Sequence, residues 1–170
     1  NQRAFGAWLD GLDTAARLVF DPSPVVATIP ADLLELAQKK STWISANAKE
    51  ALILTGQADP AAAAESLALR GNGLGGALVR NGADGCYLSM TGSCANHVPG
   101  LPVLAVDTNG AGDAHLGSFI AALADGESPL QAARYADAAA ALSTTKDGPA
   151  TAPGSHDVLA ALSQQAKANP

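Results

Sequence analysis

The chain is poor in charged and aromatic side chains. Only 15% of its 170 residues are charged and 4% are aromatic, whereas 48% are hydrophobic. A composition this apolar excludes a disordered chain, and it requires a core built from aliphatic and small side chains. We therefore expect a globular protein, and the length favours a single domain.

Positive charge is also scarce. The formal net charge is -6, and the ten Lys and Arg residues form no basic stripe. A surface of this kind cannot neutralise a phosphate backbone, so nucleic acid is not an expected partner. Any phosphate group must be bound by a local structure.

Cysteines are few and long apolar runs are missing. Cys86 and Cys94 flank a predicted hairpin turn without lying opposite one another, so we expect no disulfide.

No apolar run approaches the roughly 20 residues that cross a bilayer, and no charged-then-apolar leader is seen, so we expect a cytoplasmic protein without a membrane partner. Because the chain begins with Asn1 rather than Met, inside a predicted helix, we interpret it as a fragment or a processed product.

Predicted strands and helices alternate along most of the chain. The strands are predicted at residues 17–21, 42–46, 76–80, 86–90, 94–98 and 103–106. The helices are predicted at residues 4–16, 31–40, 47–56, 59–70, 110–124, 129–145 and 156–167. This alternation is typical of an α/β fold with a mostly parallel sheet, in which ligands bind beyond the carboxyl ends of the strands.

The segment of residues 106–123 contains the most informative pattern. An apolar run meets the turn Gly110-Ala111-Gly112, which opens directly into a helix with an apolar face. The two glycines let the backbone bend tightly, so that amide N–H groups at the helix N-terminus point towards an anion. Asp113 follows in the first helical turn, where the helix dipole favours a carboxylate.

Phosphoryl transfer needs both of these features. The moving group must be surrounded by positive dipoles, and a base must be within hydrogen-bond reach of the attacking hydroxyl. A simpler interpretation is a glycine-rich turn in which Asp113 only complements the dipole, and for an isolated Gly-x-Gly-Asp pattern this interpretation is the better one. Asp107, ahead of the two glycines, favours the phosphoryl-transfer interpretation.

The segment Asp107-Thr-Asn-Gly-Ala-Gly-Asp113 resembles the second signature of the ribokinase/pfkB family of carbohydrate kinases. Further blocks resemble the family in the same order, at residues 20–22, 47–56, 79–85 and 133–148. The likeness covers nearly the whole chain. It implies a three-layer, ribokinase-like α/β sandwich with a mostly parallel sheet, of which residues 1–170 form the C-terminal, nucleotide-binding and catalytic part.

The resemblance implies ATP-dependent phosphorylation of a sugar hydroxyl. Asp113 matches the general base of the family, and the amides of Gly110, Ala111 and Gly112 match its anion hole. The residues implied to bind nucleotide are Arg80, Gly82, Gly85, Asp137 and Gly148.

The resemblance also implies cations. Asn47 and Glu50 match residues that place Mg²⁺ near the nucleotide phosphates, and Asp107 with the Gly148 loop matches positions that surround a monovalent cation such as K⁺ in many members. Asn47 followed by Glu50 three residues later is equally well interpreted as a capping box. Asp107 taken alone is a carboxylate at a strand end.

The sequence departs from the family at several positions. Arg80-Asn81 replaces a pair that often contains Thr or Lys, Ser118 stands where Gly or Ala is usual, and Asp137 stands where a neutral residue is expected. The N-terminal half of the family, with its sugar-binding glycines and lid strands, is missing from the chain. We therefore expect the isolated chain to bind nucleotide weakly and to turn over no sugar, because nothing positions the acceptor hydroxyl.

Two other functions stay open. One is a nucleoside or vitamin kinase of the same fold, and the other is a non-catalytic relative that senses a sugar or a nucleotide. For a full-length member the resemblance implies a homodimer.

Other patterns are better interpreted as structural. Residues 71–76 match Gly-x-Gly-x-x-Gly but follow a helix and precede a strand, which is typical of a loop and not of a dinucleotide site. Ser155-His156-Asp157 is interpreted as a helix cap, because neighbouring residues on one turn point apart. His97 and His115 lack metal-ligand spacing, so we interpret both as isolated, partly buried polar residues.

Overall fold

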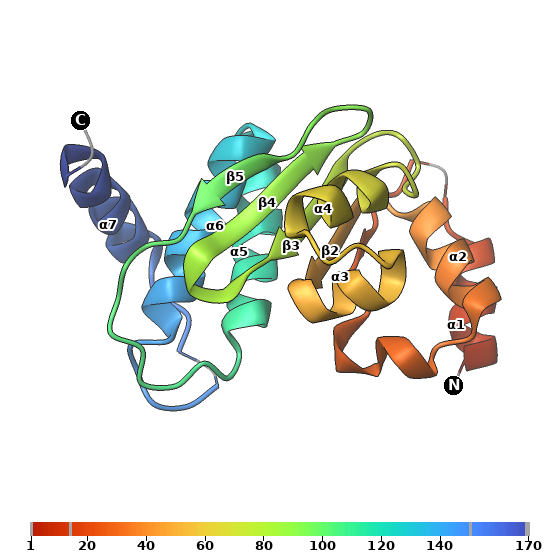
Figure 1. The fold of residues 1–170 in the computed structure, drawn as a ribbon, viewed down its shortest axis with the longest axis horizontal. Coiled ribbons are helices and arrows are strands. Elements are labelled where there is room, and N and C mark those ends of the chain that lie inside the picture. The colour runs from red at the N-terminus through yellow and green to blue at the C-terminus, as the bar shows by residue number, and fades with distance from the viewer. Residues whose placement is uncertain (1, 14, 150, 169–170) are drawn as a thin grey trace. The chain divides into compact units, whose positions relative to one another are not determined.

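The structure is a computed structural model that describes residues 2–13, 15–149 and 151–168 (Figure 1). Its strands are β1 (Val19–Phe20), β2 (Trp43–Asn47), β3 (Gly76–Arg80), β4 (Gly85–Met90) and β5 (Asn96–Pro99). Its helices are α1 (Gln2–Asp10), α2 (Ala31–Lys40), α3 (Ala48–Thr55), α4 (Pro60–Ala68), α5 (Ala111–Ala124), α6 (Pro129–Ser143) and α7 (Ser155–Ala168), with short 3₁₀ segments η1 (Ser23–Thr28) and η2 (Gly82–Asp84). None of the described helices is both long and apolar enough to cross a membrane.

The strands form one mixed sheet in the order β1-β2-β3-β4-β5. β1 pairs with β2 in parallel, and β2 pairs with β3 in parallel, with Ile44 opposite Ala77. β3 and β4 are separated by only residues 81–84, a connection too short for the crossover that a parallel pair requires, so β4 runs antiparallel to β3. The predicted α/β fold with a mostly parallel sheet is confirmed.

The chain forms two compact units. The first unit consists of residues 1–81 and 87–97, and the second unit consists of residues 82–86 and 98–170. In the first unit, α3 and α4 pack on β2 and β3, and α1 packs against α2 (Figure 1). The buried core of this unit comprises Leu9, Phe20, Leu33, Ala37, Ile44, Ala46, Ala51, Ala63, Ala64, Leu67, Ala68, Ala77 and Val79.

In the second unit, helix α6 packs against both α5 and α7. Its buried positions are mostly alanine: Ala132, Ala133, Ala136, Ala138 and Ala139. Small side chains at a helix contact let the two helix axes approach closely, so α6 can contact both neighbouring helices. Val158 of α7 completes a small apolar cluster with Ala138 and Ala139.

The ends of the helices follow their sequence signals closely. α2 covers the predicted residues 31–40, and α3 lies between its N-cap Asn47 and its left-handed C-cap Gly56. α1 is the exception, because it ends at Asp10 whereas the prediction extended to residue 16. The Asp13 carboxylate accepts a hydrogen bond from the Ala15 N–H at 2.9 Å, and this local turn replaces the next helical turn. Residue 14, within the predicted helix, lies outside the described residues.

The predicted strand at residues 103–106 is wrong. No described strand pairs with this segment, and its apolar side chains are exposed, Leu104 at 88% and Val106 at 65%. The Val106 N–H instead donates to the Thr144 carbonyl at 2.7 Å, which ties the segment to the end of α6. An apolar run predicts a strand only where a neighbouring strand is available, and here the backbone hydrogen bond is made elsewhere.

Candidate active site

The predicted glycine turn starts helix α5 in the second unit. Gly110 is the N-cap residue and has a left-handed backbone, with φ of 79°. A Cβ atom at this position would lie 2.1 Å from the carbonyl oxygen of Pro149, closer than any real contact. Both observations require glycine at position 110.

The first turn of α5 presents amide groups that the helix does not use. The Ala111 N–H donates to the Thr108 carbonyl at 3.3 Å, which is a long hydrogen bond. Among the described residues, no backbone hydrogen bond uses the N–H groups of Gly110, Gly112 or Asp113. The N-terminus of a helix with unused amides is suited to bind an anion.

Asp113 lies in this first turn and is exposed. Its carboxylate is therefore not sequestered in the core. A carboxylate at this position interacts favourably with the dipole of the helix.

Two loops meet beside the start of α5. Oδ2 of Asp107 accepts a hydrogen bond from the Gly148 N–H at 3.1 Å, and Oδ1 accepts one from the Asn109 N–H at 2.9 Å. The predicted pair Asp107 and Gly148 is thus brought together. With the close approach of Pro149 to Gly110, the loop before α5 and the loop after α6 form one cluster.

The predicted nucleotide-contact glycines lie at the first residue of the short segment η2 and directly after its end. Gly82 has φ of 62°, and no other atom lies within 4 Å of the position of an added Cβ. Gly85 has φ of 94°, and an added Cβ would lie 2.1 Å from the Val98 carbonyl oxygen. Gly85 is therefore required by the close approach of β5, whereas no packing contact explains Gly82.

Asp137 is buried in α6 with 8% of its surface exposed. Its Oδ1 lies 3.3 Å from Nε2 of His115, which is itself 2% exposed. The prediction that His115 is isolated and partly buried is wrong, because α5 and α6 bring the two side chains together. His97 is exposed, and its ring centroid lies 4.9 Å from that of Tyr87.

A pocket of about 570 Å³ lies beside Asp137 in the second unit. Gln131, Arg134 and Tyr135 from α6 and Leu162 from α7 also line it. Its volume falls in the range of about 300–1,000 Å³ that small-molecule sites occupy. Asp137 is a predicted site residue, so this pocket includes part of the predicted nucleotide site.

In the first unit, Asn47 and Glu50 form the predicted capping box. The Glu50 N–H donates to Oδ1 of Asn47 at 2.9 Å, and the Asn47 N–H donates to Oε2 of Glu50 at 2.8 Å. The structural interpretation of this pair is confirmed. Each of the two oxygen atoms keeps a further lone pair for another partner.

Arg80 lies between carboxylates at the carboxyl ends of β1, β2 and β3. Its Nη1 donates to Oδ2 of Asp21 at 2.8 Å and to Oγ of Ser45 at 3.0 Å, and its Nη2 lies 3.7 Å from Oε2 of Glu50. Asp21 and Ser45 are functional candidates that the sequence did not reveal. The available signal was an acidic residue directly after a buried strand, at the sheet edge where ligands gather.

Arg80 stabilises this edge of the first unit, and its removal is expected to be costly. The side chains of Arg80, Asp21 and Glu50 are 15%, 18% and 7% exposed, so Arg80→Met leaves two poorly solvated carboxylates without their cation. We expect the free energy of unfolding to fall by about 3 kcal/mol in urea denaturation. Arg80→Lys should lose about half as much, since it keeps the charge. Equal stability of Arg80→Met and the parent would contradict this role.

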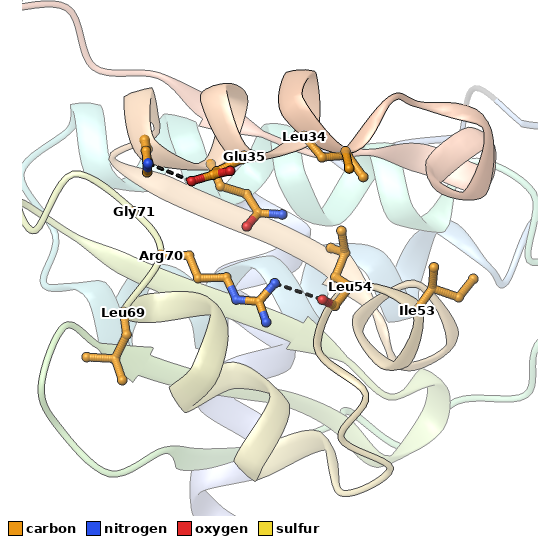
Figure 2. A pocket seen from close by; sticks show the side chains of 10 residues that line it. Leu34, Glu35, Ile53, Leu54, Leu69, Arg70 and Gly71 are labelled. Carbon is orange, nitrogen blue, oxygen red and sulfur yellow. Dashed lines mark hydrogen bonds and ion pairs between the residues drawn. The ribbon is translucent and has the colours of Figure 1, made fainter.

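A second pocket, in the first unit, contains none of the predicted site residues. It measures about 660 Å³ and lies between α2 and the ends of α3 and α4 (Figure 2). Figure 2 shows the Arg70 guanidinium directed at the Leu54 carbonyl, to which it donates at 2.7 Å. At its rim, Lys39 lies 2.6 Å from Glu35 and lowers the pKa of that carboxyl through a hydrogen bond and its charge. The charged groups Arg70, Lys39 and Glu35 are paired within the pocket lining, which gives no reason to place the chemistry here.

An open α/β sheet and a helix that begins at a glycine turn place the chain in the class of α/β proteins, in which strand and helix ends often bind phosphorylated ligands. Residues 12–155 match the family described as pfkB family carbohydrate kinase. The chain belongs to this family of carbohydrate kinases.

Individual relatives agree with this assignment. A ribokinase of Haemophilus influenzae is 33% identical over 146 residues, which cover 82% of this chain and 47% of the relative. The crystal structure of a ribokinase from Thermotoga maritima matches with a TM-score of 0.78 and 29% identity, over 93% of this chain and 52% of that one. A putative ribokinase II from E. coli in complex with ATP and Mg²⁺ matches with a TM-score of 0.76 and 25% identity, over 88% of this chain and 49% of that one. The chain thus spans about half the length of these relatives.

Proposed function

We propose that the protein containing this chain transfers a phosphoryl group from ATP to a hydroxyl group of a sugar. Membership of the pfkB family supports a phosphotransferase. The observation that carries the assignment of the site is the exposed Asp113, directly after a turn in which only glycine fits at position 110.

In the proposed reaction, Asp113 accepts the proton of the acceptor hydroxyl. The hydroxyl oxygen forms a bond to the terminal phosphorus of ATP while the bond to ADP breaks. The amides of Gly110, Ala111 and Gly112 stabilise the negative charge on the transferred group, and the unused N–H groups of Gly110 and Gly112 support this role better than that of Ala111, which already donates to Thr108.

The proposed Mg²⁺ site is formed by Asn47 and Glu50. Carboxylate and amide oxygens are ligands that Mg²⁺ prefers, and both side chains retain lone pairs beside their capping bonds. Glu50 is 5% exposed and lies near Arg80, which favours contact with the ion through its bound waters. When bound, Mg²⁺ neutralises charge on the nucleotide phosphates.

The remaining contacts belong to the same proposal. Arg80, Gly82, Gly85, Asp137 and Gly148 are proposed to contact the nucleotide, with Asp137 acting from the pocket that it lines. Asp107 is proposed to hold a cation such as K⁺ with the Gly148 loop, because each of its oxygens accepts only one described hydrogen bond. The complete protein is further proposed to be a homodimer located in the cytoplasm.

The variant Asn47→Ala distinguishes the helix-capping role of Asn47 from its proposed role in Mg²⁺ binding. We expect a loss of about 1 kcal/mol in stability from the missing cap, and a rise of about 10- to 100-fold in the Mg²⁺ concentration needed for half-maximal activity. Ser128→Ala is the matched control, because Ser128 and Gln131 form the equivalent capping box on α6. This control should lose similar stability without a change in Mg²⁺ requirement. Equal Mg²⁺ requirements of the two variants would leave Asn47 with a capping role alone.

The function itself is tested with the complete gene product that carries this chain. ADP formation from ATP is measured over a panel of pentoses, hexoses and nucleosides, and the product is identified by mass spectrometry. We expect ADP formation with at least one sugar. Turnover of nucleosides alone would move the assignment to a nucleoside kinase, and tight nucleotide binding without turnover of any acceptor would indicate a sensor.

A further inference from the structure

A cluster of metal-ligating side chains is buried inside the second unit. Cys86 comes from β4, His115 from α5 and Asp137 from α6. The three residues are 0%, 2% and 8% exposed, and one ligand atom from each lies within 4.8 Å of the others. None of them is close to another in the sequence, so no spacing pattern reveals the cluster.

Two side chains of this cluster, His115 and Asp137, have buried polar atoms without a hydrogen-bond partner. Within the described part of the chain, Nδ1 and Nε2 of His115 and Oδ2 of Asp137 are buried and form no hydrogen bond. Nε2 of His115 lies 3.3 Å from Oδ1 of Asp137 without the alignment of a hydrogen bond. Buried imidazole and carboxylate groups are normally satisfied, and leaving them unsatisfied destabilises the folded state. A bound cation would supply the missing partner.

We propose that Cys86, His115 and Asp137 bind one Zn²⁺ ion. Sulfur, imidazole nitrogen and carboxylate oxygen are the three ligand types of Zn²⁺ in proteins, whereas Mg²⁺ takes oxygen ligands. A thiolate and a carboxylate together carry the charge that balances a divalent ion. Three protein ligands leave the fourth position of the tetrahedron for a water molecule.

The geometry of the His115–Asp137 pair fits this ion. For tetrahedral Zn²⁺ with bonds of about 2.0–2.1 Å, neighbouring nitrogen and oxygen ligands lie about 3.3 Å apart. The separation of Nε2 of His115 and Oδ1 of Asp137 is 3.3 Å. The separation of this pair therefore matches one edge of the tetrahedron, and the Cys86 ligand atom lies within 4.8 Å of both.

Such an ion would crosslink β4, α5 and α6, so its expected effect is on the stability of the second unit. His115 lies two residues after Asp113 in α5, so the ion would also fix the helix that carries the proposed base. The site does not depend on the proposed kinase reaction. A chain with no kinase activity would still bind the ion.

Cobalt is a direct probe of the ligand set. The complete gene product, without an affinity tag, is reduced, stripped of metal and titrated with Co²⁺, and then Zn²⁺ is added. We expect one equivalent of Co²⁺ with a thiolate-to-cobalt charge-transfer band and tetrahedral visible bands, all lost on addition of Zn²⁺. Cys86→Ser should lose the charge-transfer band, whereas Cys94→Ser, which changes an exposed cysteine, should keep it. A parent protein without this band would overturn the proposal, and so would a band lost only in Cys94→Ser.

Thermal unfolding provides a second readout. Zn²⁺ at about one hundred times its Kd should raise the unfolding midpoint of the parent by about 5 °C. Asp137→Asn should lose this shift and weaken Zn²⁺ binding at least about 10-fold, while its midpoint in EDTA and its far-UV circular dichroism verify that it is folded. An equal shift in Asp137→Asn and the parent would exclude Asp137 as a ligand. ATP affinity of the same variant reports separately on the proposed nucleotide contact.

Discussion

Asp113→Asn is expected to lower kcat by about 100- to 10,000-fold in the complete protein, because the acceptor hydroxyl loses its base. Asn has nearly the same shape, and position 113 is exposed, so the fold should be retained. The affinity for ATP should change by no more than about twofold, since the proposed role of Asp113 is towards the hydroxyl. Initial rates over a range of acceptor concentrations, with ATP binding by calorimetry, measure both quantities.

Asp125→Asn is the matched control for this substitution. Asp125 is also exposed and lies on the same helix, as the C-cap of α5, but far from the glycine turn. Its kcat should remain at the parent value. Equal activity of Asp113→Asn and Asp125→Asn would remove Asp113 from the reaction.

Gly110→Ala is expected to impair both stability and activity. The left-handed backbone and the approach of the Pro149 carbonyl leave no room for a methyl group, so we expect a loss of about 2–4 kcal/mol in the free energy of unfolding. Displacement of the amides should also lower kcat by about 100- to 1,000-fold under conditions where the variant is folded. Urea denaturation and steady-state kinetics at a temperature below the unfolding midpoint measure the two effects.

Gly117→Ala is the control within the same helix. Gly117 is exposed, has no left-handed backbone, and an added Cβ would meet no atom within 4 Å. This substitution should stabilise the protein by about 0.5–1 kcal/mol, because alanine is the better helix former. Similar losses at positions 110 and 117 would show that a methyl group on α5 is harmful for a general reason and not because of the turn.

Local signals in the sequence predicted most of the fold. Asn47 and Gly56 delimit α3, and Ser128 caps α6, because a cap depends on residues only a few positions away. The strand at residues 76–80 was predicted with its observed bounds, since a buried apolar run bounded by glycine and a charged residue has few other conformations.

Contacts between distant segments could not be predicted. The strand expected at residues 103–106 required a neighbouring strand, and the sequence does not say whether one is present. His115 and Asp137 are far apart in the sequence, and only the packing of α5 on α6 places them together. For the predicted site, the turn at Gly110 and the pair Asp107–Gly148 could be proposed because both lie in segments that resemble the family.

The single guanidinium shared by two acids has a consequence for how this protein can change over time. Asp21, Glu50 and Arg80 come from three separate parts of the chain, yet both acids depend on Arg80 for their charge balance. A homologue in which Arg80 is replaced by an uncharged residue is expected to be less stable unless Asp21 and Glu50 are also replaced by neutral residues. Among homologues, substitutions at these three positions should therefore occur together, because a single substitution leaves an unpaired charge.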